Sequence, residues 1–419
     1  MEKPIGLRSL TVYTDYIIVL LSILSVSPFF SMIVNTFLQI FLVFLLWIRF
    51  LRGGAFYDYR INITLFFVYA LLVVQALISG VISYAILYTP FIIFYIPFLI
   101  YKLLGINYFR YFIKSMYIIA IYTFIIWLMQ CFIISFDEYL QKLIILAMPY
   151  SWSAVPRSLL IYTAAWGDTV YNDTFGIYRN SGIFHEPGAY GVFLCFTFVI
   201  NYFLTGNLFD KKNRVFLLCI LSTLSTTAYF VIFVVFLFYL FSSRQNPAIK
   251  IIGLIIFLFL SFTVYESTDF LKEKVESQYA DQIAAVNDNL GRNEAKSGRF
   301  YAFFTSVKLF LEHPIFGRGI IYGTSEKATG EMNKDSSYSY GAIGLFSTYG
   351  LFFGIYYLFY FYQGLKFLSH KHKIMQTMLI GIFIGIQLSL SSQVFILSIP
   401  FVILFILGSQ NSNKKVIWK

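Results

Sequence analysis

Charge is scarce in this sequence of 419 residues: Asp, Glu, Lys and Arg make up 12% of it, whereas hydrophobic residues make up 59%. Soluble domains carry roughly 25% charged residues, so this shortage excludes an ordinary soluble protein. The few charges leave uncharged runs at 16–48, 61–101, 115–136, 187–209, 215–243, 251–265, 336–365 and 374–413. Because a helix of about 20 apolar residues crosses a bilayer, these runs predict roughly ten to twelve membrane-spanning helices.

Cysteine is also rare, and the three cysteines, Cys131, Cys195 and Cys219, all lie within apolar runs. This placement argues against disulfides and against a cysteine metal site, since buried thiols usually pack as small hydrophobic groups. No carboxylate pair at the spacing of metal ligands stands out either. We therefore expect neither a metal nor a cofactor.

The distribution of Lys and Arg predicts how the chain is threaded through the membrane. The run 215–243 forms either one helix or two short helices broken at "STLSTT" (Ser222–Thr227). Two helices give about twelve crossings, with both termini in the cytoplasm and the acidic excess outside. A single helix would place the basic "HKHK" outside, so we expect two. The net charge of +11 then reflects contact with the inner leaflet and not with nucleic acid.

Two long loops are expected outside the cytoplasm, at about 137–187 and 266–337. Long ordered loops tend to carry function. In the second loop, the spacing of apolar residues in "RFYAFFTSVKLFLEH" predicts an amphipathic helix that ends before Pro314. With no internal repeat and no low-complexity linker, residues 1–419 are expected to form one all-α polytopic membrane domain.

Ionisable residues are nearly absent from the apolar runs. The main polar side chains there are Gln75, Gln130, Gln387 and Gln393. Ion-coupled transporters usually place carboxylates or bases near the middle of the bilayer. Here the ionisable residues lie at the outer surface, which favours chemistry on a lipid headgroup over transport.

One polar stretch, "YRNSGIFHEPGAYG", brings Arg179, His185 and Glu186 to the start of a predicted helix. A proline at the first helical position with a carboxylate beside it also has a purely structural explanation. A lone interfacial histidine often makes only local hydrogen bonds. Arg179, however, runs against the charge bias of the outer face. Glu186, His185 and, from the second loop, His313 are the candidate proton acceptors.

Three arginines of this face, Arg179, Arg299 and Arg318, are candidates for binding a pyrophosphate. Guanidinium groups bind phosphate oxygens in a bidentate manner and stay charged at physiological pH. Each of them, taken singly, is also explained as an arginine that extends to the membrane interface. The candidates for stacking on sugar rings, which would equally serve as interfacial anchors, are Trp152, Trp166, Tyr171, Tyr178 and Tyr338.

The motifs "RNSGIFHEPGAYG", "SGRFYAFFTSVKLFLEHPIFGRG" and "SSYSYGAIGLFSTYGLFFG" resemble, in this order, those of bacterial O-antigen polymerases and ligases. The resemblance implies a membrane glycosyltransferase of the GT-C type in the bacterial inner membrane. It implies a donor and an acceptor linked to undecaprenyl pyrophosphate, used outside the cytoplasm, and a co-polymerase that sets chain length. Tyrosine at 338 stands where ligases of this superfamily tend to carry histidine, which favours a polymerase. The arginine usual near "STLSTT" is absent.

The hypothesis that follows is a polymerase that joins lipid-linked repeat units of an O-antigen, capsule or exopolysaccharide. A hydroxyl of the acceptor attacks the anomeric carbon of the donor, and the arginines stabilise the departing undecaprenyl pyrophosphate. The alternatives are a ligase that transfers the glycan to another acceptor and a transporter or flippase of lipid-linked oligosaccharide.

Overall fold

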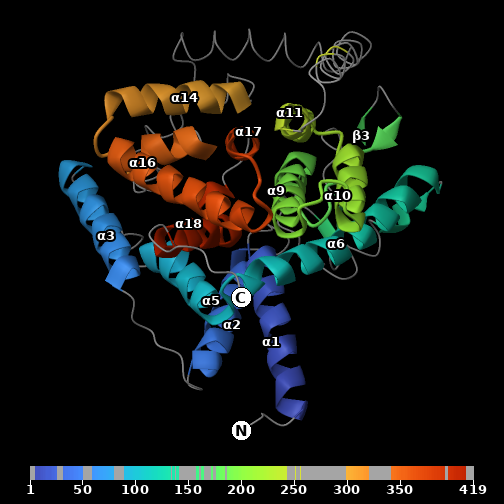
Figure 1. The fold of residues 1–419 in the computed structure, drawn as a ribbon, viewed down its shortest axis with the longest axis horizontal. Coiled ribbons are helices and arrows are strands. Elements are labelled where there is room, and N and C mark those ends of the chain that lie inside the picture. The colour runs from blue at the N-terminus through green and yellow to red at the C-terminus, as the bar shows by residue number, and fades with distance from the viewer. Residues whose placement is uncertain are drawn as a thin grey trace.

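A computed structural model describes residues 5–25, 32–50, 59–79, 89–133, 135–136, 138–140, 157–159, 162–164, 171–172, 176–184, 186–242, 251, 255, 299–319, 341–391 and 395–411. This part of the chain is mainly helical (Figure 1). The four described helices that are long and apolar enough to cross a membrane are α3 (Tyr59–Ser79), α6 (Asn107–Phe132), α9 (Pro187–Thr205) and α16 (Gly341–Ser369).

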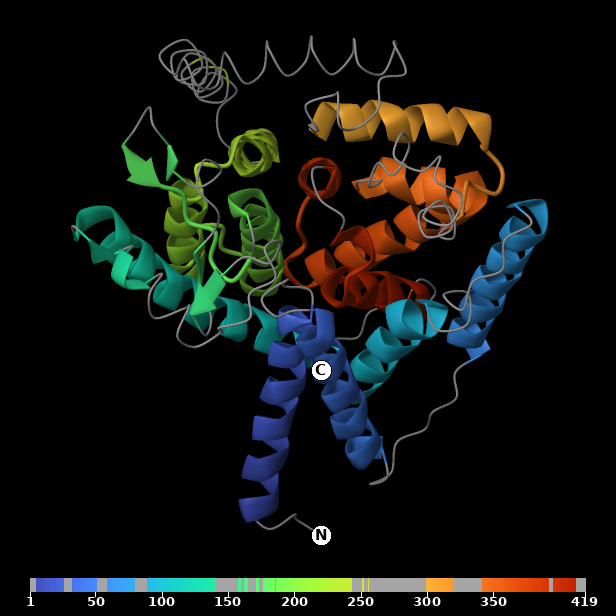
Figure 2. The same cartoon turned by 180° about the vertical axis from the view of Figure 1, so that it is seen from behind.

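The other apolar helices contain shorter apolar stretches among the described residues (Figure 2). They are α1 (Ile5–Leu24), α2 (Met32–Phe50), η1 (Phe91–Tyr95), which continues into α5 (Ile96–Leu104), α11 (Thr226–Ser242), α17 (Gln376–Leu390) and α18 (Ile399–Asn411). The architecture is that of an all-α membrane protein. The total of about twelve crossings and the bounds of the two outer loops stay predictions.

Helix α9 lies near the middle of the molecule (Figure 1). In its most apolar stretch, 89% of the residues are buried inside the protein. Phenylalanine rings fill the space around it. The ring centroids of Phe184 and Phe193 are 4.6 Å apart, and those of Phe196 and Phe401, from α18, are 4.4 Å apart. Aromatic pairs at such distances contribute beyond their buried area, which gives the many phenylalanines a packing role.

Small residues allow α16 and α18 to pack with their main chains in contact. A Cβ at Gly408 would lie 1.9 Å from the carbonyl oxygen of Tyr360, and a Cβ at Gly364 would lie 2.1 Å from that of Leu404. In membranes, where the hydrophobic effect does little to drive helices together, such close approach supplies the packing that holds them.

The break predicted within 215–243 is confirmed. Helix α10 covers Lys211–Ser222, and α11 begins at Thr226. Leu224, between them, has a φ of 46°, which ends the helical path. At 12 residues, α10 is about 18 Å long and shorter than the bilayer core.

The first long loop contains two short antiparallel hairpins, β1 (Arg157–Leu159) with β2 (Tyr162–Ala164) and β3 (Tyr171–Asn172) with β4 (Ile177–Tyr178). The prediction of helices alone missed them. Ladders of two or three residues are too short to show the alternation of polar and apolar residues that marks a strand.

The side chain of Asp210 caps the start of α10. Its Oδ2 accepts hydrogen bonds of 3.2 Å from the backbone N–H of Lys212 and from Nδ2 of the buried Asn201. Partial burial raises the pKa of the carboxyl group, but the hydrogen bonds from Asn201 and from the backbone outweigh it, so this pKa lies below its usual value. The ionised form is therefore favoured by folding.

Replacing Asp210 with Ala should lower the free energy of unfolding by about 1 kcal/mol. Because folding lowers the pKa, this contribution is complete above about pH 4 and is lost as the pH falls through the folded-state value. Thermal unfolding of Asp210→Ala and Asp210→Asn in detergent between pH 3 and 7 measures it. Asn also caps helices, so Asp210→Asn should be less destabilised at pH 7. Equal stability of Asp210→Ala and wild type at pH 7 would contradict the capping role.

Candidate functional site

Helix α16 is interrupted at Gly350, whose φ of 81° and ψ of 177° lie outside the helical region. This combination is essentially restricted to glycine. A Cβ at this position would also lie 2.1 Å from the carbonyl oxygen of Ile315. Glycine at 350 therefore lets another segment of the chain touch the main chain of α16.

The segment in contact is 313–319, here named the Arg318 turn, which follows helix α14 (Arg299–Glu312). Helix α14 lies across α16 (Figure 1), with the rings of Phe310 and Phe346 5.7 Å apart. It ends directly before His313, which confirms the helix predicted here and its end before the proline.

The Arg318 turn is joined to α16 through main-chain groups. In an unbroken helix the N–H of Leu351 would donate to the carbonyl of Ser347. Here it donates to the carbonyl of Pro314 at 2.8 Å, and the carbonyl of Ser347 accepts from the N–H of Arg318 at 2.7 Å. The break thus exchanges a helical hydrogen bond for two tertiary ones. It explains why two motifs about 30 residues apart in the sequence lie together.

Helix α3 completes the arrangement through the buried amide of Gln75. Its Nε2 donates to the carbonyl of Thr348 at 2.8 Å and, at a shorter distance, to that of Phe316. The carbonyl of Thr348 also accepts from the N–H of Gly319 at 3.0 Å. Three elements distant in sequence therefore meet at the break of α16.

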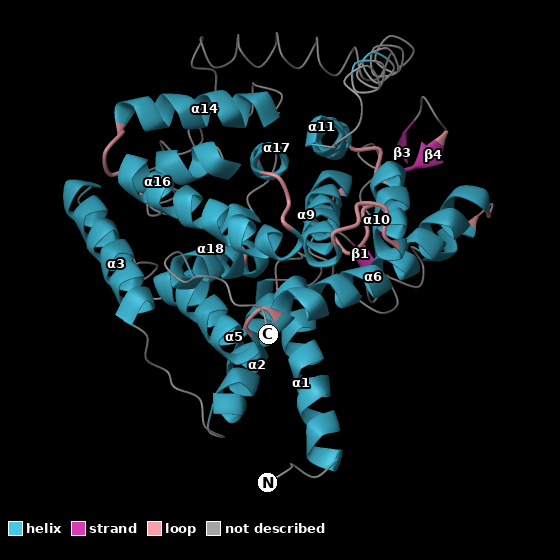
Figure 3. Cartoon of the chain, in the orientation of Figure 1, coloured by secondary structure: helices cyan, strands magenta, loops and turns pink. Residues whose placement is uncertain are grey.

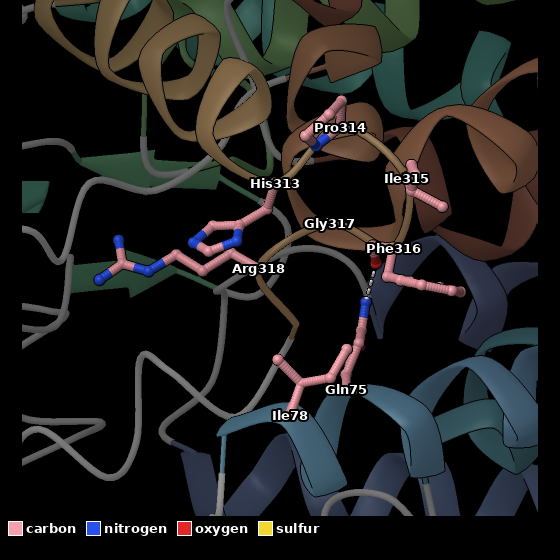
Figure 4. A pocket seen from close by; sticks show the side chains of 8 residues that line it. All are labelled: Gln75, Ile78, His313, Pro314, Ile315, Phe316, Gly317 and Arg318. Atoms are coloured by element: carbon pink, nitrogen blue, oxygen red, sulfur yellow. Dashed lines mark hydrogen bonds between the residues drawn. The ribbon is translucent and has the colours of Figure 1, made fainter.

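A cavity of about 300 Å³ opens at this junction (Figure 4). It is lined by Gln75, Ile78, His313, Pro314, Ile315, Phe316, Gly317 and Arg318. The side chains of His313 and Arg318 extend next to each other on one side, and those of Ile315 and Phe316 lie on the other (Figure 4). The walls therefore combine a cationic part with an apolar part.

This combination suits a ligand that carries both an anionic and an apolar group. The guanidinium group of Arg318 can bind two oxygens of a phosphate at once. The imidazole of His313 is exposed and can exchange a proton with a hydroxyl group. The exposed Ile78 and Ile315 provide the apolar surface at the rim.

Arg179 is held at a different place, the break between α10 and α11. Its Nε donates to the carbonyl of Thr223 at 3.3 Å and its Nη2 to that of Leu224 at 3.1 Å. The next residue, Asn180, is buried and bonds the main chain and the hydroxyl of Ser222, both at 2.9 Å. Arg179 therefore supplies donors to carbonyls that the end of α10 leaves without helical partners.

The three candidate arginines are not gathered in one cavity within the described part of the chain. Arg179 follows β4 and contacts the end of α10, whereas the Arg318 turn lies beside α3 on the opposite side of the molecule (Figure 3). Arg299 begins α14, which has 14 residues, so it starts about 20 Å from the Arg318 turn. The side chain of Arg299 lies outside the described residues.

Glu186 precedes Pro187, which occupies the first position of α9 as predicted. Its backbone is extended, with φ −142° and ψ 151°, and its side chain makes no capping hydrogen bond to the helix. Glu186 does not line the cavity described above. His185 lies outside the described residues, so a catalytic role of either residue stays a prediction.

The candidate sugar-stacking residues are only partly described. Tyr171 and Tyr178 are paired across the β3–β4 hairpin, and the carbonyl of Tyr178 accepts from the indole N–H of Trp127 at 2.6 Å. The side chain of Tyr171 and the residues Trp152, Trp166 and Tyr338 lie outside the described part.

Sequence reasoning noticed Gln75 but gave it no role, and it gave none to Gly350. For Gln75 a signal was available, because polar side chains are rare in the apolar runs. A polar group in a membrane helix turns towards a protein partner, so Gln75 could have been expected to contact another segment. For Gly350 no such signal existed, since it is one of 26 glycines in the chain and glycine is common in membrane helices generally.

Comparison with known proteins gives one family. Residues 215–362 match the model of a family described as O-antigen ligase. The matched stretch, about a third of the chain, runs from α10 into α16 and includes both the Arg318 turn and the break at Gly350. A search among curated proteins found no match. The match supports a place for this chain among the membrane glycan-transferring enzymes of the O-antigen polymerase and ligase superfamily and does not separate a polymerase from a ligase.

Proposed function

We propose that the protein is a polysaccharide polymerase that joins oligosaccharide repeat units carried on undecaprenyl pyrophosphate. The reaction takes place on the outer face of the bacterial plasma membrane. The observation that carries this proposal is the cavity at the break of α16, where the guanidinium group of Arg318 and the imidazole of His313 meet an apolar rim inside the stretch that matches the family. A lipid diphosphate has the complementary chemistry.

The chemistry needs charge stabilisation and a proton acceptor. A hydroxyl oxygen of the acceptor repeat unit forms a bond to the anomeric carbon of the donor, and the bond from that carbon to the pyrophosphate oxygen breaks. Arg318 stabilises the negative charge on the departing pyrophosphate. His313, which lines the same cavity, takes the proton of the attacking hydroxyl. Of the candidate acceptors in the sequence, it is the one that this cavity favours.

A ligase is the second candidate, favoured by the description of the matching family. It would use the same donor and the same stabilisation of the leaving group but transfer the finished glycan to a different acceptor. Tyrosine at position 338, where ligases tend to carry histidine, favours the polymerase.

Purified protein mixed with single lipid-linked repeat units distinguishes the candidates. A polymerase lengthens the chains, and the products form a ladder on a gel. A ligase leaves single units unchanged until a separate acceptor is added, and a transporter forms no glycosidic bond with either. In cells, deletion of a polymerase should leave single repeats, whereas deletion of a ligase should leave polymer on the carrier lipid. Failure to elongate with or without a co-polymerase would overturn the proposal.

A further inference from the structure

Helix α3 has two different long faces. Towards the protein, Arg60 donates to the carbonyls of Ser409 and Gln410, both at 2.8 Å, and Thr64 Oγ1 is 2.8 Å from the hydroxyl of Tyr356. On the opposite face the exposed residues are Ile63, Phe66, Val73 and Leu77. Because lipid offers no hydrogen-bond partners, the polar residues identify the face that is fastened to the protein.

Gln75 lies near the end of α3 and is 4% exposed. It differs from the other polar contacts of this helix because it bonds both the Arg318 turn and the part of α16 to which that turn is joined. The carbonyl of Phe316 precedes Arg318 by two residues, and the carbonyl of Thr348, on α16, also accepts from the N–H of Gly319, which follows Arg318. One amide group therefore links the Arg318 turn to the break of α16 beside Arg318.

The surroundings of Gln75 indicate that the N–H groups of its amide contribute more to its interactions than its oxygen does. Oε1 of Gln75 is buried without a hydrogen-bond partner among the described residues and is the atom that a Cβ at Gly319 would meet, at 3.1 Å. An unpaired buried acceptor is unfavourable, and an apolar side chain would avoid it. What the amide gains in exchange is one bond to the Arg318 turn and one to the carbonyl of Thr348, to which that turn is also bonded.

We propose that Gln75 is the positioning residue of Arg318: it fixes the Arg318 turn against α16 so that Arg318 stays beside His313 at the wall of the cavity and distinguishes a lipid pyrophosphate from a lipid monophosphate (Figure 4). This inference rests on the proposed function, because it assumes that the cavity binds the anionic end of the carrier lipid. A bidentate guanidinium binds best when its direction is fixed, and a loosely held one acts more as a diffuse charge. Selectivity, and not binding alone, is therefore the property that Gln75 controls.

Binding of two probes, undecaprenyl pyrophosphate and undecaprenyl phosphate, to the full-length protein in nanodiscs tests this role. Gln75→Met keeps the length of the side chain without the amide, and Gln75→Asn keeps the amide on a chain too short to reach both carbonyls. Arg318→Ala should lower the affinity for the pyrophosphate lipid about tenfold, and Gln75→Met about fivefold. The affinity for the monophosphate lipid should change less than twofold in Gln75→Met.

The double variant Gln75→Met/Arg318→Ala should bind the pyrophosphate lipid no more weakly than Arg318→Ala alone, since residues that act through each other are not additive. Thr64→Val is the matched control, because it removes another polar contact of α3 and should leave the selectivity unchanged. Wild-type selectivity in both Gln75 variants, or additive effects in the double variant, would overturn the positioning role alone. A wild-type protein that binds neither probe would overturn the proposed function together with it.

Discussion

Gly350→Ala is expected to abolish elongation and to destabilise the folded protein by about 3 kcal/mol or more. The new methyl group requires a backbone conformation that alanine rarely adopts, and it meets the carbonyl oxygen of Ile315 at 2.1 Å. The methyl group of alanine has a position fixed by its own backbone, and the oxygen belongs to the main chain, so a change of rotamer cannot relieve the contact. Relief requires the Arg318 turn to leave α16, with loss of its hydrogen bonds and of the cavity. Thermal unfolding in detergent and the elongation assay measure the two effects.

Gly385→Ala, in α17, is the control for this substitution. A Cβ at Gly385 would lie 3.6 Å from a methyl group of Val231, an ordinary contact, and alanine favours a helix over glycine. This variant should be as stable as wild type or slightly more stable, with elongation retained. A Gly350→Ala variant with the stability and chain length of wild type would show that the break in α16 is not required.

Arg318→Ala and Arg179→Ala are expected to differ in their effect on the stability of the folded protein. The side chain of Arg318 lines the cavity, so its loss should reduce elongation about 100-fold or more with little change in thermal stability. Arg179 donates to the carbonyls of Thr223 and Leu224 at the break between α10 and α11. The substitution Arg179→Ala should therefore lower the free energy of unfolding by about 1–3 kcal/mol, because these two carbonyls lose their donors.

Elongation and the unfolding temperature, measured on the same preparations, separate these two roles. Arg179→Lys serves as the matched variant, since a lysine can donate to one carbonyl but does not reproduce the planar fork of a guanidinium group. It should recover part of the stability that Arg179→Ala loses. If Arg179→Ala unfolds like wild type yet no longer elongates, Arg179 acts on the ligand and the structural explanation is wrong.

The parts of the fold that could be predicted from the sequence follow from neighbouring residues or from the distribution of charge along the chain. The placement of basic segments predicts the break between α10 and α11, and the steric effect of proline, a local signal, predicts the end of α14 before Pro314. Pro187 at the start of α9 is of the same kind.

The candidate site depends on contacts between distant segments, and the sequence held little information about them. The apolar run of α16 gives no local indication of a break at Gly350, since the break is stabilised by hydrogen bonds from the Arg318 turn. The expected convergence of three arginines rested on their placement on one membrane face. A common face does not fix lateral distance, and helix α14 separates Arg299 from Arg318.

The way in which the Arg318 turn is fastened has a consequence for the evolution of substrate preference. Its bonds to α16 and to Gln75 are made by carbonyl and N–H groups of the main chain, which every amino acid but proline supplies. The side chains of Ile315 and Phe316 can therefore be exchanged without detaching the turn. Under the proposed function, such an arrangement would let related enzymes accept different repeat units while the main-chain contacts around Arg318 stay the same.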